Sequence, residues 1–182
     1  KSYCRRLKKI LAAASIAQVH KAILKDGTPV ILKIRWPGLR KIIEADLRLL
    51  QRIVDIAEAE SPDIRRFHPK EVLRQFNQSL RRELDLAGEC RNAERVAANL
   101  ADDPNIVILK VYWQWTGERI NVQEYIEGIH GRDLEAIEKS GLDRKILADR
   151  GSKAVLKMIM EDGFFHADPH PGNVFYLPDN RL

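Results

Sequence analysis

The sequence predicts an α+β protein with two lobes, in which strands dominate the first half and helices the second. Two features carry this prediction. Short runs rich in β-branched residues alternate with segments whose apolar residues recur every three or four positions. The expected order is two strands, two helices, two strands, two helices, a loop and a short strand. The 182 residues are enough for one compact domain or for part of a larger one.

Two β-hairpins are predicted, one on each side of a helical region. Residues 19–24 and 29–35 are rich in β-branched side chains, and the Asp-Gly pair between them is a strong hairpin signal. Residues 106–112 and 119–126 form the second predicted hairpin, with a Thr-Gly pair at its turn. Both hairpins belong to the first lobe.

Four helices are predicted from apolar residues spaced at the helical period. Two long ones cover 39–60 and about 69–100, separated by a Ser-Pro-Asp break. A short helix over 133–139 and a longer one over about 143–162 follow the second hairpin. The helix over 39–60 is an insertion in the first lobe, and simple core packing explains it better than a partner or membrane surface does.

The lobe boundary is predicted in a glycine-containing linker over 127–131. We assign 1–126 to a small lobe and 127–182 to the start of a large lobe, with the hinge near 124–131. The large lobe is expected to end in a loop over 164–173 and a short strand over 174–177.

Composition excludes several classes of protein. Lys and Arg number 31 and Asp and Glu 26, so the formal net charge is +5. Phosphates or an anionic membrane surface account for this modest excess, and we expect no nucleic-acid partner. Two cysteines, Cys4 and Cys90, argue against a disulfide-rich secreted scaffold and indicate a reducing compartment. No apolar run approaches the ~18 residues of a membrane span. We expect the chain to be a piece of a longer protein, because it lacks an initiator Met.

The segment from His166 to Asn173 carries the strongest chemical pattern. Its spacing, His-x-Asp-x-x-x-x-Asn, is that of a kinase catalytic loop. Asp168 can orient the proton of the attacking hydroxyl, and Asn173 can reach a metal ion bound to phosphates. Two alternatives stay open from the residues alone: a polar loop that satisfies its own backbone, and a metal site built from His166, Asp168 and His170.

A lysine and an acidic helix complete the pattern of a phosphate site. Lys33 ends a Val-Ile-Leu-Lys run that resembles the strand whose lysine clamps nucleotide phosphates. Glu83, Asp85 and Glu89 lie on the second long helix, and a strand lysine paired with such an acid positions phosphates in kinases. Each feature alone also fits a solvated charged face. Their order along the chain, however, predicts a nucleotide-phosphate site in a bilobal protein-kinase-like fold.

With these motifs the sequence resembles the UbiB family of atypical kinase-like proteins. The matching segments are the Ala-rich run 12–20, the strand 30–33 with Arg-Trp-Pro-Gly at 35–38, Glu-Leu-Asp at 83–85 and the loop 166–173. The Ala-rich run stands where ordinary kinases have a glycine-rich loop. The catalytic-loop motif is less specific to the family, because aminoglycoside and choline phosphotransferases contain similar motifs.

The resemblance implies roles for individual residues. Lys33 would contact the phosphates and pair with Glu89, Asp168 would be the catalytic-loop aspartate, and Asn173 would be a Mg²⁺ ligand. The remaining implied residues are an Ala-rich nucleotide loop (Ala12, Ala13, Ala14, Ser15), an adenine-binding hinge (Glu124, Tyr125, Ile126), and Glu83 and Asp85, which would engage the lysine of a Lys-x-Gly-Gln element. That element precedes the Ala-rich loop in the family, blocks protein substrates and is absent from this sequence.

The resemblance also implies cofactors, partners and a location. ATP or ADP with Mg²⁺ would be bound, and the activity would support ubiquinone or another isoprenoid quinone. Quinone-biosynthesis proteins and membrane lipid would be partners. The location would be the cytoplasmic face of a bacterial inner membrane, or a mitochondrion or plastid, with membrane association through regions not present in this chain.

Two further expectations follow from departures from the family pattern. The Asp-Phe-Gly metal site should follow the strand after Asn173, and the sequence stops before it. We therefore expect little phosphoryl transfer by this chain alone. The alternatives to an enzyme of the UbiB type are a nucleotide-binding pseudokinase that acts as a scaffold for a membrane complex, and a small-molecule phosphotransferase of the aminoglycoside or choline type.

Overall fold

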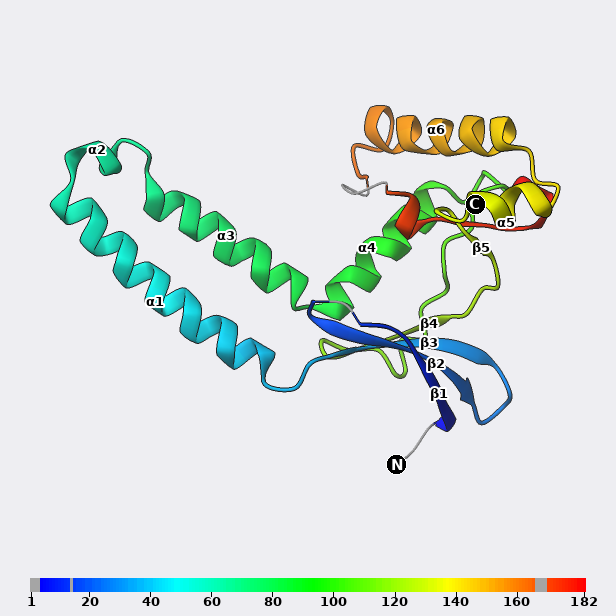
Figure 1. The fold of residues 1–182 in the computed structure, drawn as a ribbon, viewed down its shortest axis with the longest axis horizontal. Coiled ribbons are helices and arrows are strands. Elements are labelled where there is room, and N and C mark those ends of the chain that lie inside the picture. The colour runs from blue at the N-terminus through cyan, green and yellow to red at the C-terminus, as the bar shows by residue number, and fades with distance from the viewer. Residues whose placement is uncertain (1–3, 14, 166–169) are drawn as a thin grey trace. The chain divides into compact units, whose positions relative to one another are not determined.

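A four-stranded sheet organises the first part of the chain in the computed structural model, which describes residues 4–13, 15–165 and 170–182 (Figure 1). The strands stand in the order β1-β2-β3-β4. Their bounds are Cys4–Ala13, Ala17–Leu24, Pro29–Arg35 and Ile120–Glu124. The predicted first hairpin is confirmed: β2 and β3 pair antiparallel, and Gly27 takes a φ of 92° at the turn. A positive φ of this kind is readily adopted only by glycine.

The chain divides into two compact units. Unit 1 comprises Lys1–Cys90 and Val111–Gln123, and unit 2 comprises Arg91–Lys110 and Glu124–Leu182. The last division, between Gln123 and Glu124, falls three residues before the lobe boundary expected at 126/127. The segment Arg91–Lys110, expected in the small lobe, groups with unit 2.

One face of the sheet in unit 1 carries the apolar core. Ala22, Leu24, Val30, Leu32 and Val122 are buried together. Removing a leucine side chain from water stabilises a fold by about 1.5–3 kcal/mol, so this layer holds the sheet together. Ile34, Tyr112 and Trp115 pack against its edge.

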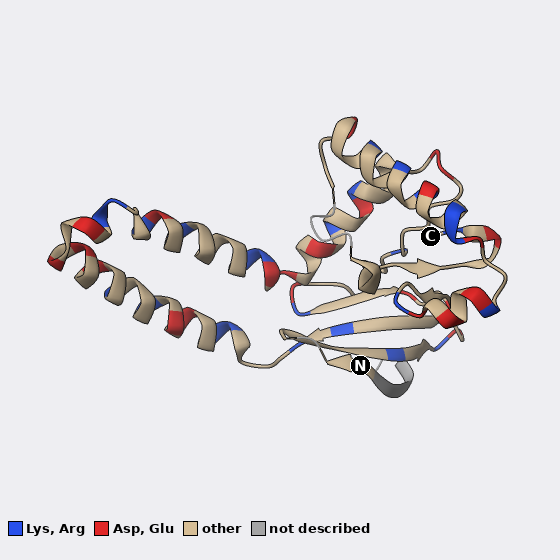
Figure 2. Ribbon diagram, turned by 45° about the horizontal axis from the view of Figure 1, so that its top comes forward, with Lys and Arg blue, Asp and Glu red and all other residues tan. Residues whose placement is uncertain are grey.

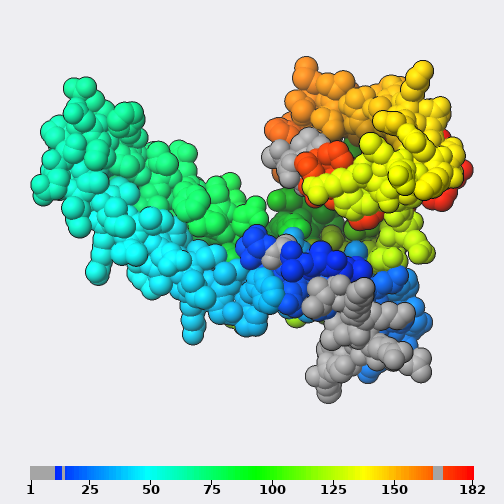
Figure 3. Space-filling view, in the orientation of Figure 1, coloured from blue at the N-terminus to red at the C-terminus, as the bar shows by residue number. Residues whose placement is uncertain are grey.

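The inserted helix is present with its predicted bounds. Helix α1 (Leu39–Glu60) is followed by the single turn α2 (Pro62–Arg65) and by α3 (Pro69–Glu83). Helices α1 and α3 lie side by side in unit 1, as Figures 1 and 3 show. Acidic and basic residues are interspersed along both helices (Figure 2). Several of them form exposed ion pairs, such as Arg74 with Glu71.

The prediction of one helix from about 69 to 100 is wrong. Helix α3 ends at Glu83, and a separate helix α4 (Leu86–Asn99) begins three residues later. At the break, the Leu86 N–H donates to the Glu118 carbonyl at 3.3 Å instead of to a helical partner. The Asp85 carboxylate accepts from the Ala87 N–H at 3.1 Å, as an N-terminal cap does. Tertiary contacts therefore interrupt a pattern that continues in the sequence.

The second predicted hairpin forms only in part. Residues 106–112 are not a strand, and only Val111 makes an isolated antiparallel bridge, with Gln123 of β4. The start of this segment pairs elsewhere in unit 2: the Val107 N–H donates to the Leu182 carbonyl at 2.6 Å, and the Leu182 N–H donates to the Asn105 carbonyl at 2.8 Å. A distant segment thus competes for backbone groups that the sequence assigns to the hairpin.

Unit 2 contains the two predicted helices and a small sheet. Helices α5 (Leu134–Lys139) and α6 (Arg144–Met160) start after Asp133 and Asp143, whose carboxylates accept from backbone N–H groups of the first turn. The linker predicted at 127–131 contains a strand, β5 (Ile129–His130), which pairs with β6 (Phe175–Tyr176). The expected strand at 174–177 is therefore confirmed, and its partner was missed.

Candidate functional site

Lys33 lies on β3 and contacts a carboxylate from α4. Its Nζ donates to Glu89 Oε1 at 2.8 Å and to Oε2 at 2.7 Å. The side chains are 25% and 49% exposed, so the pair is accessible from solvent. Leu32 and Ile34, the neighbours of Lys33 on β3, line the opposite, apolar face. The contact expected between Lys33 and Glu89 is present, and its role in binding phosphates stays a prediction.

The break between α3 and α4 sets the position of Glu89. Arg35, two residues after Lys33 on β3, is 7% exposed and donates from its guanidinium to the Leu84 carbonyl at the break. Leu86 and Cys90 of α4 are fully buried. The first turn of α4 is therefore held against β3, the strand that carries Lys33. Glu89 belongs to this first turn.

The two acids expected in one helix with Glu89 have different surroundings. Glu83 is the last residue of α3 and is exposed, whereas Asp85 lies in the break, half-buried, with its carboxylate capping α4. The expectation that Asp85 and Glu89 are helical neighbours is thus corrected, because α4 begins after Asp85. No Lys-x-Gly-Gln element is present in the sequence to test their implied partner.

The Ala-rich segment is partly strand. Ala12 and Ala13 are the last residues of β1, paired with Val19 and Gln18 of β2. Ser15 lies in the bend that follows, and Ala14 lies outside the described residues. Ala12 and Ala13 are therefore part of a strand and not of a loop, because β2 pairs with their backbone. Nucleotide binding by the segment Ala12, Ala13, Ala14 and Ser15 stays a prediction.

The implied hinge begins at the end of β4. The Glu124 N–H donates to the Lys110 carbonyl at 2.9 Å, and the Glu124 carboxylate accepts from the Lys110 N–H at 3.4 Å. Tyr125 and Ile126 follow, half-buried and outside any strand. Adenine binding by this segment stays a prediction.

The catalytic-loop motif is described only in its second half. His166 and Asp168 lie outside the described residues. Pro171–Asn173 forms a single turn of 3₁₀ helix, capped by the His170 side chain, which accepts from the Gly172 N–H at 2.9 Å. The Asn173 N–H donates to the His170 carbonyl at 2.8 Å, and Asn173 is exposed at the end of the turn.

Two residues that the sequence analysis did not single out support this turn. Arg132 and Gly131 follow β5 and contact residues 170–174. The only signal in the sequence was a glycine in a segment that was interpreted as a linker. Strand β5 itself is two residues long, too short for an alternating pattern to reveal it.

The part of the chain that the structure describes contains no group of three or more His, Cys, Asp or Glu side chains that could hold a metal ion. Mg²⁺ does not need such a cage. It is commonly held by one or two protein oxygen ligands together with substrate phosphates. The exposed carboxamide of Asn173, with the carboxylate of Asp168 five residues earlier, fits that donor chemistry.

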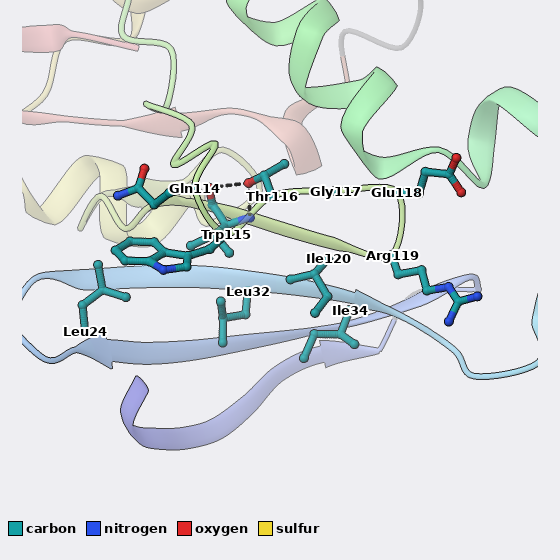
Figure 4. Close-up of a pocket in the computed structure, with 11 residues that line it drawn as sticks. Leu24, Leu32, Ile34, Gln114, Trp115, Thr116, Gly117, Glu118, Arg119 and Ile120 are labelled. Carbon is teal, nitrogen blue, oxygen red and sulfur yellow. Dashed lines mark hydrogen bonds between the residues drawn. The ribbon is translucent and has the colours of Figure 1, made fainter. Parts of the chain in front are cut away.

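A groove of about 730 Å³ lies on the other face of the sheet from Lys33. Figure 4 shows Trp115 and Ile120 above the sheet side chains that form its floor. Its floor is apolar and includes Leu24, Leu32 and Val122 of the core, whereas Gln114, Thr116, Glu118 and Arg119 also line it. Because the groove lies on the face opposite Lys33 and Glu89, it is not the candidate nucleotide site.

Comparisons with known proteins agree with the motifs. The ABC1 atypical kinase-like domain matches residues 3–182. Two relatives named "Probable protein kinase UbiB" are similar over 173 residues, or 94% of this chain: the protein of Aliivibrio fischeri strain MJ11 at 42% identity and that of Vibrio campbellii at 40%. The chain covers 32% of each of them, about a third of their length.

A solved structure extends this similarity to the fold. The Rv3197–erythromycin complex from Mycobacterium tuberculosis is 30% identical with a TM-score of 0.77, over 98% of this chain and 44% of that one. The predicted α+β kinase-like fold is confirmed by this match and by the family match.

Proposed function

The chain belongs to the ABC1 atypical kinase-like family, and on that premise we propose that it binds ATP with Mg²⁺ and carries the front part of a UbiB-type ATPase or phosphotransferase site. The proposal names Lys33 as the phosphate-binding cation, Glu89 as its partner and Asn173 as a Mg²⁺ ligand. Asp168 would orient the attacking hydroxyl or water.

The Lys33–Glu89 contact is the observation that carries this proposal. Lysine side chains on a solvated sheet face are long and flexible, and an exposed ion pair usually contributes at most about 1 kcal/mol to stability. This pair instead joins residues 56 positions apart with both carboxylate oxygens engaged. The two N–H groups given to Glu89 leave one on the ammonium group for a phosphate oxygen.

The remaining residues supply orientation and charge. When bound, Mg²⁺ would neutralise charge that develops on the transferred phosphoryl group. Asn173 holds its carboxamide at the end of a capped turn, which limits the positions that its oxygen can take. Asp168, as an anion near the attacking oxygen, would accept its proton or fix its direction.

The pathway and the location are also proposals. The relatives' name, UbiB, supports a role in ubiquinone biosynthesis, with quinone-biosynthesis proteins and membrane lipid as partners. Membrane association through regions outside this chain is part of the same proposal, since the chain covers 32% of each of those relatives. Among the helices that the structure describes, none combines the length and apolarity needed to cross a bilayer.

Nucleotide binding tests the proposal directly. A fluorescent ATP analogue is titrated into the chain with Mg²⁺, and the dissociation constants of wild type, Lys33→Ala and Glu89→Gln are compared. We expect Lys33→Ala to raise Kd at least about tenfold, equivalent to about 1.4 kcal/mol. Lys25→Ala is the matched control, since Lys25 is exposed at the β2–β3 turn. Equal affinity for Lys33→Ala and Lys25→Ala would refute the assignment of Lys33.

A scaffold role is separated from an enzymatic one in cells. In the full-length protein, Lys33→Ala and Asp168→Asn are each tested for complementation of quinone synthesis. Loss of complementation by both supports the enzyme. If both variants complement while nucleotide binding by Lys33→Ala is abolished, the protein acts as a scaffold and the phosphoryl-transfer part of the proposal is wrong.

A further inference from the structure

A contact in unit 2 joins the segment after β5 to the catalytic-loop turn. Arg132 Nη2 lies 3.1 Å from His170 Nδ1 and 3.2 Å from Nε2. The Gly131 N–H donates to the Val174 carbonyl at 2.9 Å. The segment after β5 thus contacts the chain both before Asn173, at His170, and after it, at Val174.

The backbone after β5 approaches the turn closely at Gly131. A Cβ on Gly131 would lie 2.6 Å from the Pro171 carbonyl oxygen, a backbone atom that cannot move aside alone, so this position requires glycine. A Cβ on Gly172 would lie 2.8 Å from the side-chain atoms Arg132 Nη2 and His170 Nδ1, so it would displace the contact between these two side chains.

Two contacts fix the orientation of the His170 ring. Its Nδ1 accepts from the Gly172 N–H at 2.9 Å, which closes the turn with its own side chain. The Arg132 guanidinium lies close to both ring nitrogens, so it holds the ring from the β5 side of the turn.

Arg132 is exposed, so burial does not explain its position. Asp133, the adjacent acid, uses its carboxylate to cap α5 through the Ala136 N–H at 3.0 Å. Among the described residues, the Arg132 guanidinium makes its polar side-chain contacts with His170 alone. A contact between an exposed guanidinium and an exposed imidazole adds little to the stability of the fold, which points to a role in geometry.

We propose that Arg132 is a positioning residue: through His170 it fixes the turn 170–173 and thereby holds the Asn173 carboxamide where it can meet a Mg²⁺–nucleotide complex. This inference rests on the proposed function. Arg132 itself would touch neither the metal nor the nucleotide. Its loss would leave the nucleotide's phosphate contact with Lys33 intact and would weaken the metal-dependent part of binding.

The test compares Arg132→Ala with wild type in the chain by two measurements. Hydrogen exchange of the Gly172 amide reports the turn, and Mg²⁺ titration at fixed fluorescent ATP analogue reports the metal-dependent step. We expect Arg132→Ala to exchange Gly172 at least about tenfold faster and to need at least about fivefold more Mg²⁺, with nucleotide affinity without Mg²⁺ unchanged. Arg132→Lys, which keeps a donor, should recover part of both effects.

Arg144→Ala is the matched control, because Arg144 loses one exposed ion pair, with Glu138 at 3.1 Å, on another part of unit 2. If Arg132→Ala and Arg144→Ala need the same Mg²⁺ concentration as wild type, the inference is overturned while the proposed function stands. If wild type binds no nucleotide, the proposed function fails, and the functional half of this inference fails with it. Unchanged exchange at Gly172 in Arg132→Ala would overturn the structural half by itself.

Discussion

Asn121→Leu should make unit 1 more stable. Asn121 lies on β4 and is 1% exposed, and neither its Oδ1 nor its Nδ2 has a hydrogen-bond partner among the residues that the structure describes. Leaving a buried polar group unsatisfied costs about 1–3 kcal/mol, whereas an apolar side chain of similar shape has no such cost. Allowing for some repacking strain, we expect the free energy of unfolding to rise by about 1–3 kcal/mol.

Asn121 lies on the same face of the sheet as Lys33 of the candidate nucleotide site. Its neighbours Ile120 and Val122 line the apolar groove, so Asn121 faces the side of the sheet that carries Lys33. The Arg35 N–H donates to the Arg119 carbonyl at 2.9 Å, which places the end of β3 beside the start of β4. Lys33 and Asn121 therefore lie on the same face of the neighbouring strands β3 and β4.

Urea unfolding followed by tryptophan fluorescence measures the effect. The three tryptophans, Trp36, Trp113 and Trp115, all belong to unit 1, so this signal reports the unit that contains Asn121. We expect a higher midpoint with an unchanged slope, and a melting temperature higher by about 2–4 °C per kcal/mol.

Asn77→Leu on α3 is the control for Asn121→Leu, because the Asn77 carboxamide accepts from Arg81 at 2.8 Å and its loss should bring no gain. A midpoint lower for Asn121→Leu than for wild type would refute the reasoning. It would mean that the carboxamide has a partner in solution, such as an enclosed water molecule.

Two further predictions concern the N-terminal cap of α6 and the dependence of stability on pH. Asp143→Ala should destabilise unit 2 by about 1 kcal/mol, measured by far-UV circular dichroism in urea, because the carboxylate accepts from the Lys145 N–H at 2.8 Å; an unchanged midpoint would contradict the cap. Hydrogen bonds from Arg74, and then from Gln75, lower the pKa of Glu71 from 4.5 to about 2. A lowered pKa adds stability above pH 4.5 that is lost as the pH falls towards about 2, so Glu71→Gln should remove part of the acid-induced drop in melting temperature, and Glu60→Gln should not.

Local patterns predicted most elements of the fold. The Asp-Gly turn and the β-branched runs around it were enough for β2 and β3, and the 3.6-residue period was enough for α1 and α6. These signals depend on residues close in the sequence, where turn chemistry and one buried face decide the structure. The same holds for the caps Asp133 and Asp143, each at the start of a predicted helix.

The errors occur where a distant residue takes a backbone group. The predicted helix over 69–100 breaks because Glu118 accepts from Leu86 and Arg35 donates to Leu84. The strand expected over 106–112 loses its start to Leu182, and the supposed linker becomes a strand because β6 pairs with it. No local sequence pattern predicts these contacts, since each of them joins segments more than 30 residues apart.

The sequence alone was enough for the α+β class, the family resemblance and the residue types of the site. The reason is that Lys33, Glu89, Asp168 and Asn173 follow one another in the order that a kinase-like site requires. The resemblance named Glu89 as the partner of Lys33, but as charges on one predicted helix Glu83, Asp85 and Glu89 were equivalent. Only the tertiary structure supplies the physical reason for the choice. The break after Leu84 turns α4 so that Asp85 becomes a cap, Glu83 stays in solvent and Glu89 alone of the three reaches the lysine.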